Sequence, residues 1–145
     1  MYPLKFVPIL KPTIWGGERI SSFKHLKFQQ QQIGESWEIS EIPGHISIVA
    51  NGKDKGKTLS MLMQEYKHRL VGKENYIHFN GRFPLLVKFI DACKNLSIQV
   101  HPDNHLASRR HQGMGKTEMW YVMDNNQGKD LLSAQATVNF SGPES

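Results

Sequence analysis

The sequence predicts a mainly β protein, a barrel or sandwich of short strands with two short helical insertions. The strand signal comes from several short runs rich in Ile, Val, Phe, Trp and Tyr that are separated by turn residues. Two segments carry helix signals instead: an apolar helical face in one, and start and stop residues around the other. The chain has 145 residues, of which 39% are hydrophobic and 21% charged, so it can bury the core of one domain but not of two. We therefore expect a single β domain.

The predicted strands share a β-branched or aromatic composition between turn signals. They cover residues 37–41, 46–50, 85–92, 96–100, 117–123 and 134–140. Turns are expected at Gly16-Gly17, Pro43-Gly44 and Asn51-Gly52. A closed double-sheet jelly roll has about eight strands, so this set predicts an incomplete one.

The first predicted helix covers residues 59–70. Its apolar side chains fall on one helical face: Leu59, Leu62, Met63, Tyr66 and Leu70. Thr58 or Ser60 can cap its amino-terminal end, and Gly72 follows its carboxyl-terminal end.

The second predicted helix is shorter and covers residues 103–112. Pro102 precedes it, Asp103 is its expected cap and Gly113 follows it.

Composition restricts the compartment and the partners. The single cysteine, Cys93, excludes an internal disulfide and a zinc site built from several cysteines, which favours a reducing cytoplasm. The amino-terminal apolar run is too short for a signal peptide, and no run is long enough to cross a membrane. The net charge is +5, but the basic residues are scattered, so we expect no nucleic-acid partner.

Polar residues alternate with apolar ones in residues 96–101. If this segment is a strand, Ser97, Gln99 and His101 point to one face, opposite the three apolar side chains. Polar residues that alternate in this way are more often a solvated face than a metal site, and a lone Gln-x-His is a weak signal.

Residues 116–122 repeat the pattern, with Lys116, Glu118 and Trp120 on one face. If both strands line the same interior, Gln99, His101 and Glu118 converge. An amide oxygen, an imidazole and a carboxylate suit a catalytic Zn²⁺ that keeps one position open for water or substrate. Such a set is incomplete, and a further ligand is expected elsewhere.

Three more residues stand out by their surroundings. Lys88 interrupts an apolar run, so it lies either on a solvated edge or in a polar pocket, and the edge is the more common case. Glu35 shares a strand face with Trp37. Trp15 packs at a tight turn or, alternatively, stacks on the C–H face of a sugar.

Five segments, taken in order, resemble type I zinc-dependent mannose-6-phosphate isomerases, and specifically their amino-terminal portion. The most specific are Leu96-Ser97-Ile98-Gln99-Val100-His101-Pro102-Asp103 and Gly115-Lys116-Thr117-Glu118-Met119-Trp120-Tyr121-Val122. Residues 12–17, 33–38 and 83–88 agree with them. The resemblance implies a cupin fold in a single domain over residues 1–145, with residues 124–145 as a divergent tail.

The resemblance also implies functional residues. One Zn²⁺ per chain would be held by Gln99, His101 and Glu118. The family's pocket residues correspond to Trp15, Glu35, Lys88, Ser97 and Lys116. Of these, Glu35, Lys88 and Lys116 are candidates for catalysis, and Trp15, Ser97, Lys88 and Lys116 for substrate binding. The family's fourth ligand, a histidine, and its catalytic arginine belong to a later part of the family sequence, and nothing here matches their motifs.

The implied activity is the interconversion of mannose 6-phosphate and fructose 6-phosphate through a zinc-assisted enediol. Two alternatives stay open: a catalytically inactive cupin remnant that binds metal or sugar phosphate, and a structural module whose polar strand residues are merely solvated. The expected partners are a small sugar phosphate and, through an exposed sheet edge, a second copy of the chain.

Overall fold

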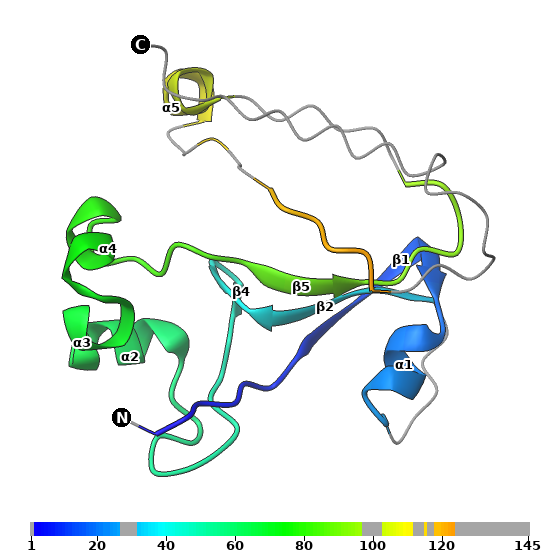
Figure 1. The fold of residues 1–145 in the computed structure, drawn as a ribbon, viewed down its shortest axis with the longest axis horizontal. Helices are drawn as coiled ribbons and strands as arrows, with labels where there is room; N and C mark the ends of the chain where they lie inside the picture. The colour runs from blue at the N-terminus through cyan, green and yellow to red at the C-terminus, as the bar shows by residue number, and fades with distance from the viewer. Residues whose placement is uncertain (1, 27–31, 97–102, 112–114, 116–117, 124–145) are drawn as a thin grey trace. The chain divides into compact units, whose positions relative to one another are not determined.

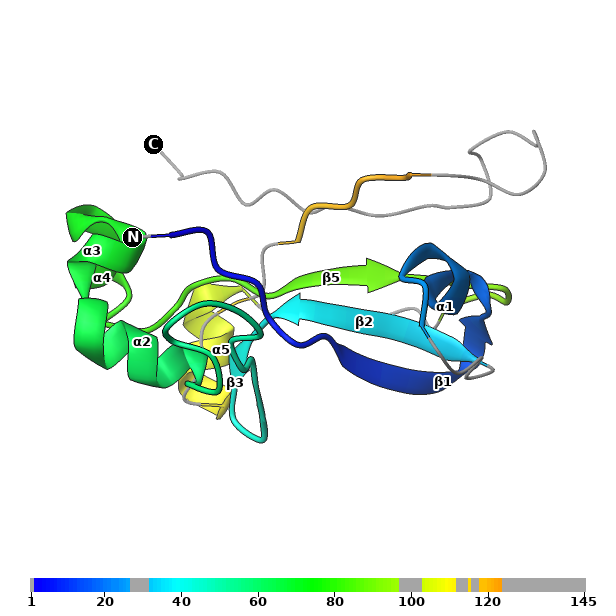
Figure 2. The same cartoon turned by 90° about the horizontal axis from the view of Figure 1, so that it is seen from below.

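The computed structural model describes residues 2–26, 32–96, 103–111, 115 and 118–123. It divides into two compact units, Met1–Leu96 and Ser97–Ser145, and each is described here by itself. The first unit is built on an antiparallel sheet of three strands in the order β1-β2-β5, which lie side by side in Figures 1 and 2. The predicted class, a β fold with short helices, is confirmed, and the described residues form no closed barrel.

Strand β1 (Ile9–Gly17) was not predicted, and its last two residues, Gly16 and Gly17, were wrongly expected to form a turn. The register with its neighbour shifts at Pro12. Proline cannot donate to a ladder and is tolerated at a sheet edge, which is where β1 lies. A Cβ on Gly16 would come within 2.5 Å of the Gly34 nitrogen, so this glycine allows close backbone approach instead of a turn.

Strands β2 (Ile33–Ile39) and β5 (Val87–Ile90) complete the sheet. Glu35 lies opposite Ile90, and Trp37 lies opposite Lys88. The predicted strand 85–92 is confirmed at its centre. The predicted strand 37–41 overlaps only the end of β2, which already begins at Ile33.

Helix α1 (Arg19–Phe23) was also not predicted, and it packs on one face of the sheet. Phe23 meets Phe89 of β5 edge to face, with ring centroids 5.2 Å apart. The backbone nitrogen of Arg19 donates to Asp91 Oδ2 at 2.7 Å. The helix is therefore held by the end of β5, about 70 residues away in sequence, and not by a local signal of its own.

A short hairpin of β3 (Glu41–Ile42) and β4 (His45–Ile46) follows β2. The predicted turn at Pro43-Gly44 is confirmed, because Gly44 has a φ of 78°, as the third position of a type II turn requires. The predicted strand 46–50 is shorter in the structure, and beyond β4 it continues only as isolated bridges at Ile48 and Val49.

The predicted helix 59–70 is divided into α2 (Leu59–Tyr66) and α3 (His68–Val71) by Lys67, whose φ is 51°. Thr58, not Ser60, is the cap of α2: its Oγ1 accepts from the Met61 nitrogen at 3.2 Å. Gly72 ends α3 as predicted, and α4 (Lys73–His78), which was not predicted, follows it. Three side chains of α2 are fully buried and form much of the core: Leu59, Leu62 and Met63.

In the second unit, α5 (Asn104–His111) confirms the predicted helix 103–112 to within one residue at each end. Asp103 is its cap, because its Oδ1 accepts from the Leu106 nitrogen at 2.7 Å.

The strand predicted at 117–123 is wrong over Glu118–Met123, which the structure assigns to no strand. Strand propensity reflects packing on a sheet more than an intrinsic backbone preference, so a β-rich run need not form a strand. Residues 97–100 and 134–140, which were also predicted as strands, lie outside the described residues.

Candidate functional site

The candidate site of the first unit begins with an ion pair between two central residues of the sheet. Lys88 Nζ on β5 lies 2.7 Å from Glu35 Oε1 on β2. The side chains of Lys88 and Glu35 are 21% and 17% exposed. Lys88 therefore lies on an outer strand of the described sheet, as one expectation had it, but its side chain is largely covered and has a carboxylate partner.

Trp37 extends this pair along β2. Its indole Nε1 donates to the second oxygen of Glu35, Oε2, at 2.6 Å. Lys11 of β1 places its Nζ 4.8 Å from the centroid of the Trp37 ring, within the range of a cation–π contact. These four residues, Lys11, Glu35, Trp37 and Lys88, come from three adjacent strands, and we call them the polar face of the sheet.

The other face of β2 has a carboxylate with different partners. Glu38 Oε2 lies 2.7 Å from Lys24 Nζ, and Glu38 Oε1 accepts from Ser36 Oγ at 2.6 Å. Alternation along the strand separates Ser36 and Glu38 from Glu35 and Trp37. The sheet therefore presents one paired carboxylate on each face.

Trp15 lies against Gly34: a Cβ built on Gly34 would be 2.6 Å from the Trp15 ring. Alternation along β2 puts this side of Gly34 opposite the side from which Glu35 projects. In the first unit the structure thus brings Glu35 and Lys88 together and places Trp15 on the other face.

The other predicted site residues fall mostly beyond what the structure describes. Ser97, Gln99, His101 and Lys116 lie outside the described residues. Glu118 is described in the second unit, where its side chain is partly exposed and has an interaction partner. Within the described ranges, no three His, Cys, Asp or Glu side chains gather as a metal site.

The chemistry of the predicted ligand set still fits zinc. His101 offers an imidazole nitrogen and Glu118 a carboxylate, which are common ligands of catalytic zinc sites. Gln99 adds an amide oxygen as a neutral oxygen donor.

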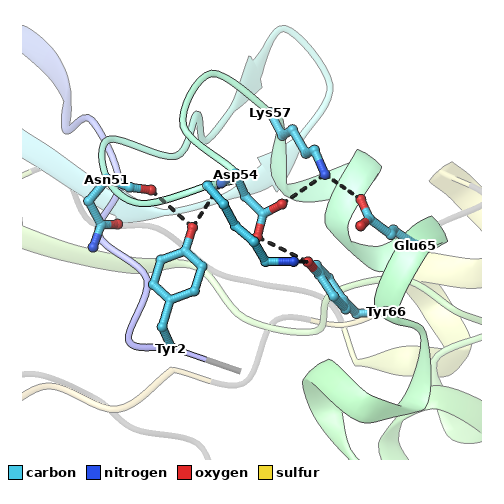
Figure 3. Close-up of polar contacts among 7 residues, drawn as sticks. Tyr2, Asn51, Asp54, Lys57, Glu65 and Tyr66 are labelled. Carbon is cyan, nitrogen blue, oxygen red and sulfur yellow. Dashed lines mark hydrogen bonds and ion pairs between the residues drawn. The ribbon is translucent and has the colours of Figure 1, made fainter.

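A second polar cluster joins the amino-terminal segment to the loop before α2 and to α2 itself (Figure 3). Asp54 is its centre and is 2% exposed. Its Oδ1 accepts from Lys57 Nζ at 2.8 Å, and its Oδ2 accepts from the Tyr66 hydroxyl at 3.0 Å. The Tyr2 hydroxyl accepts from the Asp54 nitrogen at 3.0 Å and donates to the Asn51 carbonyl at 3.0 Å.

The charges of this cluster stabilise each other. The hydrogen bond from Lys57 lowers the pKa of Asp54 below its ordinary value of 3.8. The same hydrogen bond, with a second one to Glu65 Oε2 at 2.6 Å, raises the pKa of Lys57. Because both oxygens of the buried Asp54 carboxylate have protein partners, we interpret the cluster as a structural clasp.

Neither Lys11 nor the role of Trp37 was predicted from the sequence. For Trp37 a signal existed, because it follows Glu35 by two residues and thus shares its strand face. For Lys11 there was none, because its place depends on the pairing of the unpredicted β1 with β2.

Comparisons with known proteins add an independent finding. The family model described as "Phosphomannose isomerase type I, catalytic domain" matches residues 4–141, which extends past residue 123, where the resemblance noted in the sequence ends. The chain is 37% identical over 131 residues to the mannose-6-phosphate isomerase ManA of Bacillus subtilis. It is 35% identical over 130 residues to the mannose-6-phosphate isomerase of Streptococcus mutans. Each match covers 90% of this chain and 40% of the relative.

Two solved structures resemble this one. The crystal structure of the mannose 6-phosphate isomerase from Bacillus subtilis superposes with a TM-score of 0.69 at 37% identity, over 79% of this chain and 35% of that one. An H99Q mutant of phosphomannose isomerase from Salmonella typhimurium gives a TM-score of 0.62 at 23% identity, over 73% of this chain and 27% of that one, and supports the fold alone. The chain spans about 40% of the length of the curated relatives it matches.

The described helices include none that is both long enough and apolar enough to cross a membrane.

Proposed function

Because the chain belongs to the type I phosphomannose isomerases, we propose that it acts in the interconversion of mannose 6-phosphate and fructose 6-phosphate. The observation that carries the proposal is the polar face of the sheet, where the family's pocket residues Glu35 and Lys88 form a largely covered ion pair. A charged pair with limited exposure suits the binding of a polar sugar.

The reaction relocates two protons. The C2 proton of the aldose leaves while the C1 carbonyl oxygen gains a proton, which gives an enediol; a proton then returns to C1 while the C2 hydroxyl loses its proton and becomes the ketone. This requires a positioned base near the C1–C2 edge and positive charge or hydrogen-bond donors near both oxygens, where negative charge develops.

In the proposed assignment, Glu35 is a candidate proton acceptor, and the ammonium groups of Lys88 and Lys116 stabilise the developing negative charge. Ser97 and Lys116 complete the contacts with substrate, whereas Trp15, which lies on the other face of the sheet, is left out of this assignment. Zn²⁺, held by Gln99, His101 and Glu118, would act as a Lewis acid on the sugar oxygens. The single cysteine and the metabolite substrate suit a reducing cytoplasm, where we expect the protein to act.

A coupled assay for fructose 6-phosphate formation tests the function, with added Zn²⁺ and again after chelation. We expect turnover that depends on zinc and that falls by roughly 10²-fold or more in Glu35→Gln, the order expected for loss of an acid–base group. Glu38→Gln is the matched control, since it neutralises the paired carboxylate on the other face of the same strand. Equal loss in both variants would contradict the assignment of Glu35.

The alternative, a binding module without catalysis, gives a different result in the same preparation. Saturable binding of mannose 6-phosphate by the folded chain without turnover would favour it. A folded, zinc-supplied chain that neither binds nor converts the sugar phosphate would refute both proposals.

The zinc content of purified variants tests the assignment of the metal ligands. His101→Ala and Glu118→Ala should each lower the amount of zinc that copurifies, and both should abolish turnover, because each removes one of three proposed ligands. His105→Ala, on α5, is the control and should retain zinc. A zinc content that is unchanged in either ligand variant would exclude that residue as a ligand.

A further inference from the structure

The Glu35 carboxylate receives a hydrogen bond on each of its two oxygens, from residues on two different strands. Lys88 Nζ, on β5, donates to Oε1 at 2.7 Å. Trp37 Nε1, on the same strand as Glu35, donates to Oε2 at 2.6 Å. Lysine is a flexible point charge with three donors, so it neutralises Glu35 without fixing its plane. An indole has one N–H in the plane of a rigid ring, so its bond does fix a direction.

Trp37 is itself held by residues from two other strands. Lys11 of β1 lies over its ring, with the Nζ 4.8 Å from the centroid. The imidazole of His45, on β4, packs against it at a tilt, with the ring centroids 5.4 Å apart. A side chain that is packed by neighbours on separate elements keeps one rotamer, and its N–H therefore points in one direction.

We infer that Trp37 is a positioning residue, whose indole N–H fixes the orientation of the Glu35 carboxylate on the polar face of the sheet. This inference deepens the proposed function and rests on it for its consequence in the reaction. It assigns to Trp37 no contact with substrate.

The consequence for the reaction is geometric. A glutamate side chain has three rotatable bonds, and ordering it costs side-chain entropy that must be offset before or during the reaction. A carboxylate held in one orientation by the protein meets the substrate already aligned, whereas a displacement of about 1 Å can cost on the order of 10²-fold in rate.

The contact itself is tested by ¹H–¹⁵N NMR of the indole groups in the full chain. The chain has three tryptophans, so three indole signals are expected, and the signal lost in Trp37→Phe belongs to Trp37. A bond to a carboxylate should place that signal downfield of the other two. In Glu35→Gln it should move upfield by more than either of the others.

Glu38→Gln is the matched control, because it removes a paired carboxylate from the same strand on the opposite face. It should leave the Trp37 signal in place. A Trp37 signal that does not respond to Glu35→Gln, or that responds as strongly to Glu38→Gln, overturns the inference.

The catalytic consequence is tested in the coupled assay with Trp37→Phe, which keeps an aromatic ring and removes the N–H. We expect kcat to fall roughly 10- to 100-fold with KM little changed, because alignment is lost and no substrate contact is removed. A rise in KM with kcat unchanged would instead make Trp37 a substrate contact and overturn the positioning role.

The two experiments separate the inference from the proposed function. If the wild-type chain neither binds nor converts mannose 6-phosphate, the proposed function fails, while the NMR response still decides whether Trp37 fixes Glu35. If turnover is present but the NMR response is absent, the inference alone fails.

Discussion

At the scale of single residues, three covered carboxylates of the first unit share one arrangement. Glu35, Glu38 and Asp54 each have a lysine within 2.8 Å and a second donor that orients the carboxylate. The second donors differ: an indole for Glu35, a serine hydroxyl for Glu38 and a tyrosine hydroxyl for Asp54. Pairing of this kind compensates a covered carboxylate for hydration that an unpaired charge would lose.

The clasp around Asp54 predicts a dependence of stability on pH. Its lowered pKa means that, near pH 3.8 and below, the folded chain binds fewer protons than the unfolded chain. The stabilisation is therefore fully present above that pH and is lost as the pH falls through the folded-state pKa. We expect the thermal midpoint of the wild type to fall between about pH 6 and about pH 3.

Asp54→Asn should lower the midpoint at about pH 6 and flatten its fall in acid, because the charge that titrates is gone. Glu74→Gln, on the exposed surface of α4, is the control and should keep the wild-type profile. A variant of Asp54 with an unchanged acid profile would contradict the role given to the clasp.

The raised pKa of Lys57 makes stability depend on pH in the alkaline range. The ion pairs of Lys57 contribute fully to stability at pH values below 10.5, the ordinary pKa of a lysine, and this contribution is lost as the pH rises through the folded-state pKa.

At the scale of elements, capping residues in the sequence locate the amino-terminal end of a helix more accurately than the sequence predicts the length of that helix. Asp103 caps α5 as expected, and of the two candidates Thr58 and Ser60 it is Thr58 that caps α2; each cap needs only its own side chain and a backbone nitrogen three residues later. The predicted helix 59–70 nevertheless breaks at Lys67, and no local signal marks this break in the sequence.

The cap of α2 gives a prediction at this scale. Thr58→Ala should lower the free energy of unfolding by about 0.5–2 kcal/mol, because the amide of Met61 loses its partner. Ser60→Ala, inside the helix, should cost much less and serves as the control. Urea denaturation of both variants measures the difference, and equal losses would show that Oγ1 of Thr58 does not act as the cap.

At the scale of the whole molecule, the described sheet leaves outer strands with exposed apolar side chains. β1 and β5 are its outer strands, and Ile14 and Val87 on them are 86% and 44% exposed. Exposed apolar side chains on an outer strand favour pairing with another chain. We propose that a second copy of the chain can pair there, as the sequence analysis expected.

Sedimentation velocity over a range of concentrations tests this pairing. We expect a dimer that Val87→Lys weakens by roughly tenfold or more in Kd, since an edge lysine opposes strand addition. Ile77→Lys places the same charge on α4, where Ile77 is 74% exposed, and should leave the dimer intact. A wild-type chain that is monomeric at every concentration would rule out the pairing.

The sequence by itself determined the features that depend on neighbours in the chain. The cap at Asp103, the turn at Pro43-Gly44 and the glycine that ends α3 follow from a few adjacent residues, whereas the sequence left Thr58 and Ser60 as alternative caps of α2. The family followed from ordered motifs, and the family match over residues 4–141 confirms it. The roles assigned to Gln99, His101 and Glu118 rest on the resemblance and remain predictions.

The tertiary structure alone decided the partners of the site residues. Glu35 and Lys88 are 53 positions apart, and their contact depends on the register of β2 with β5. Lys11 reaches Trp37 only because β1 pairs with β2, and Asp54 meets Tyr2 and Tyr66 from two other segments. The physical reason is that strand register is set by the packing of a whole face, which no short stretch of sequence specifies.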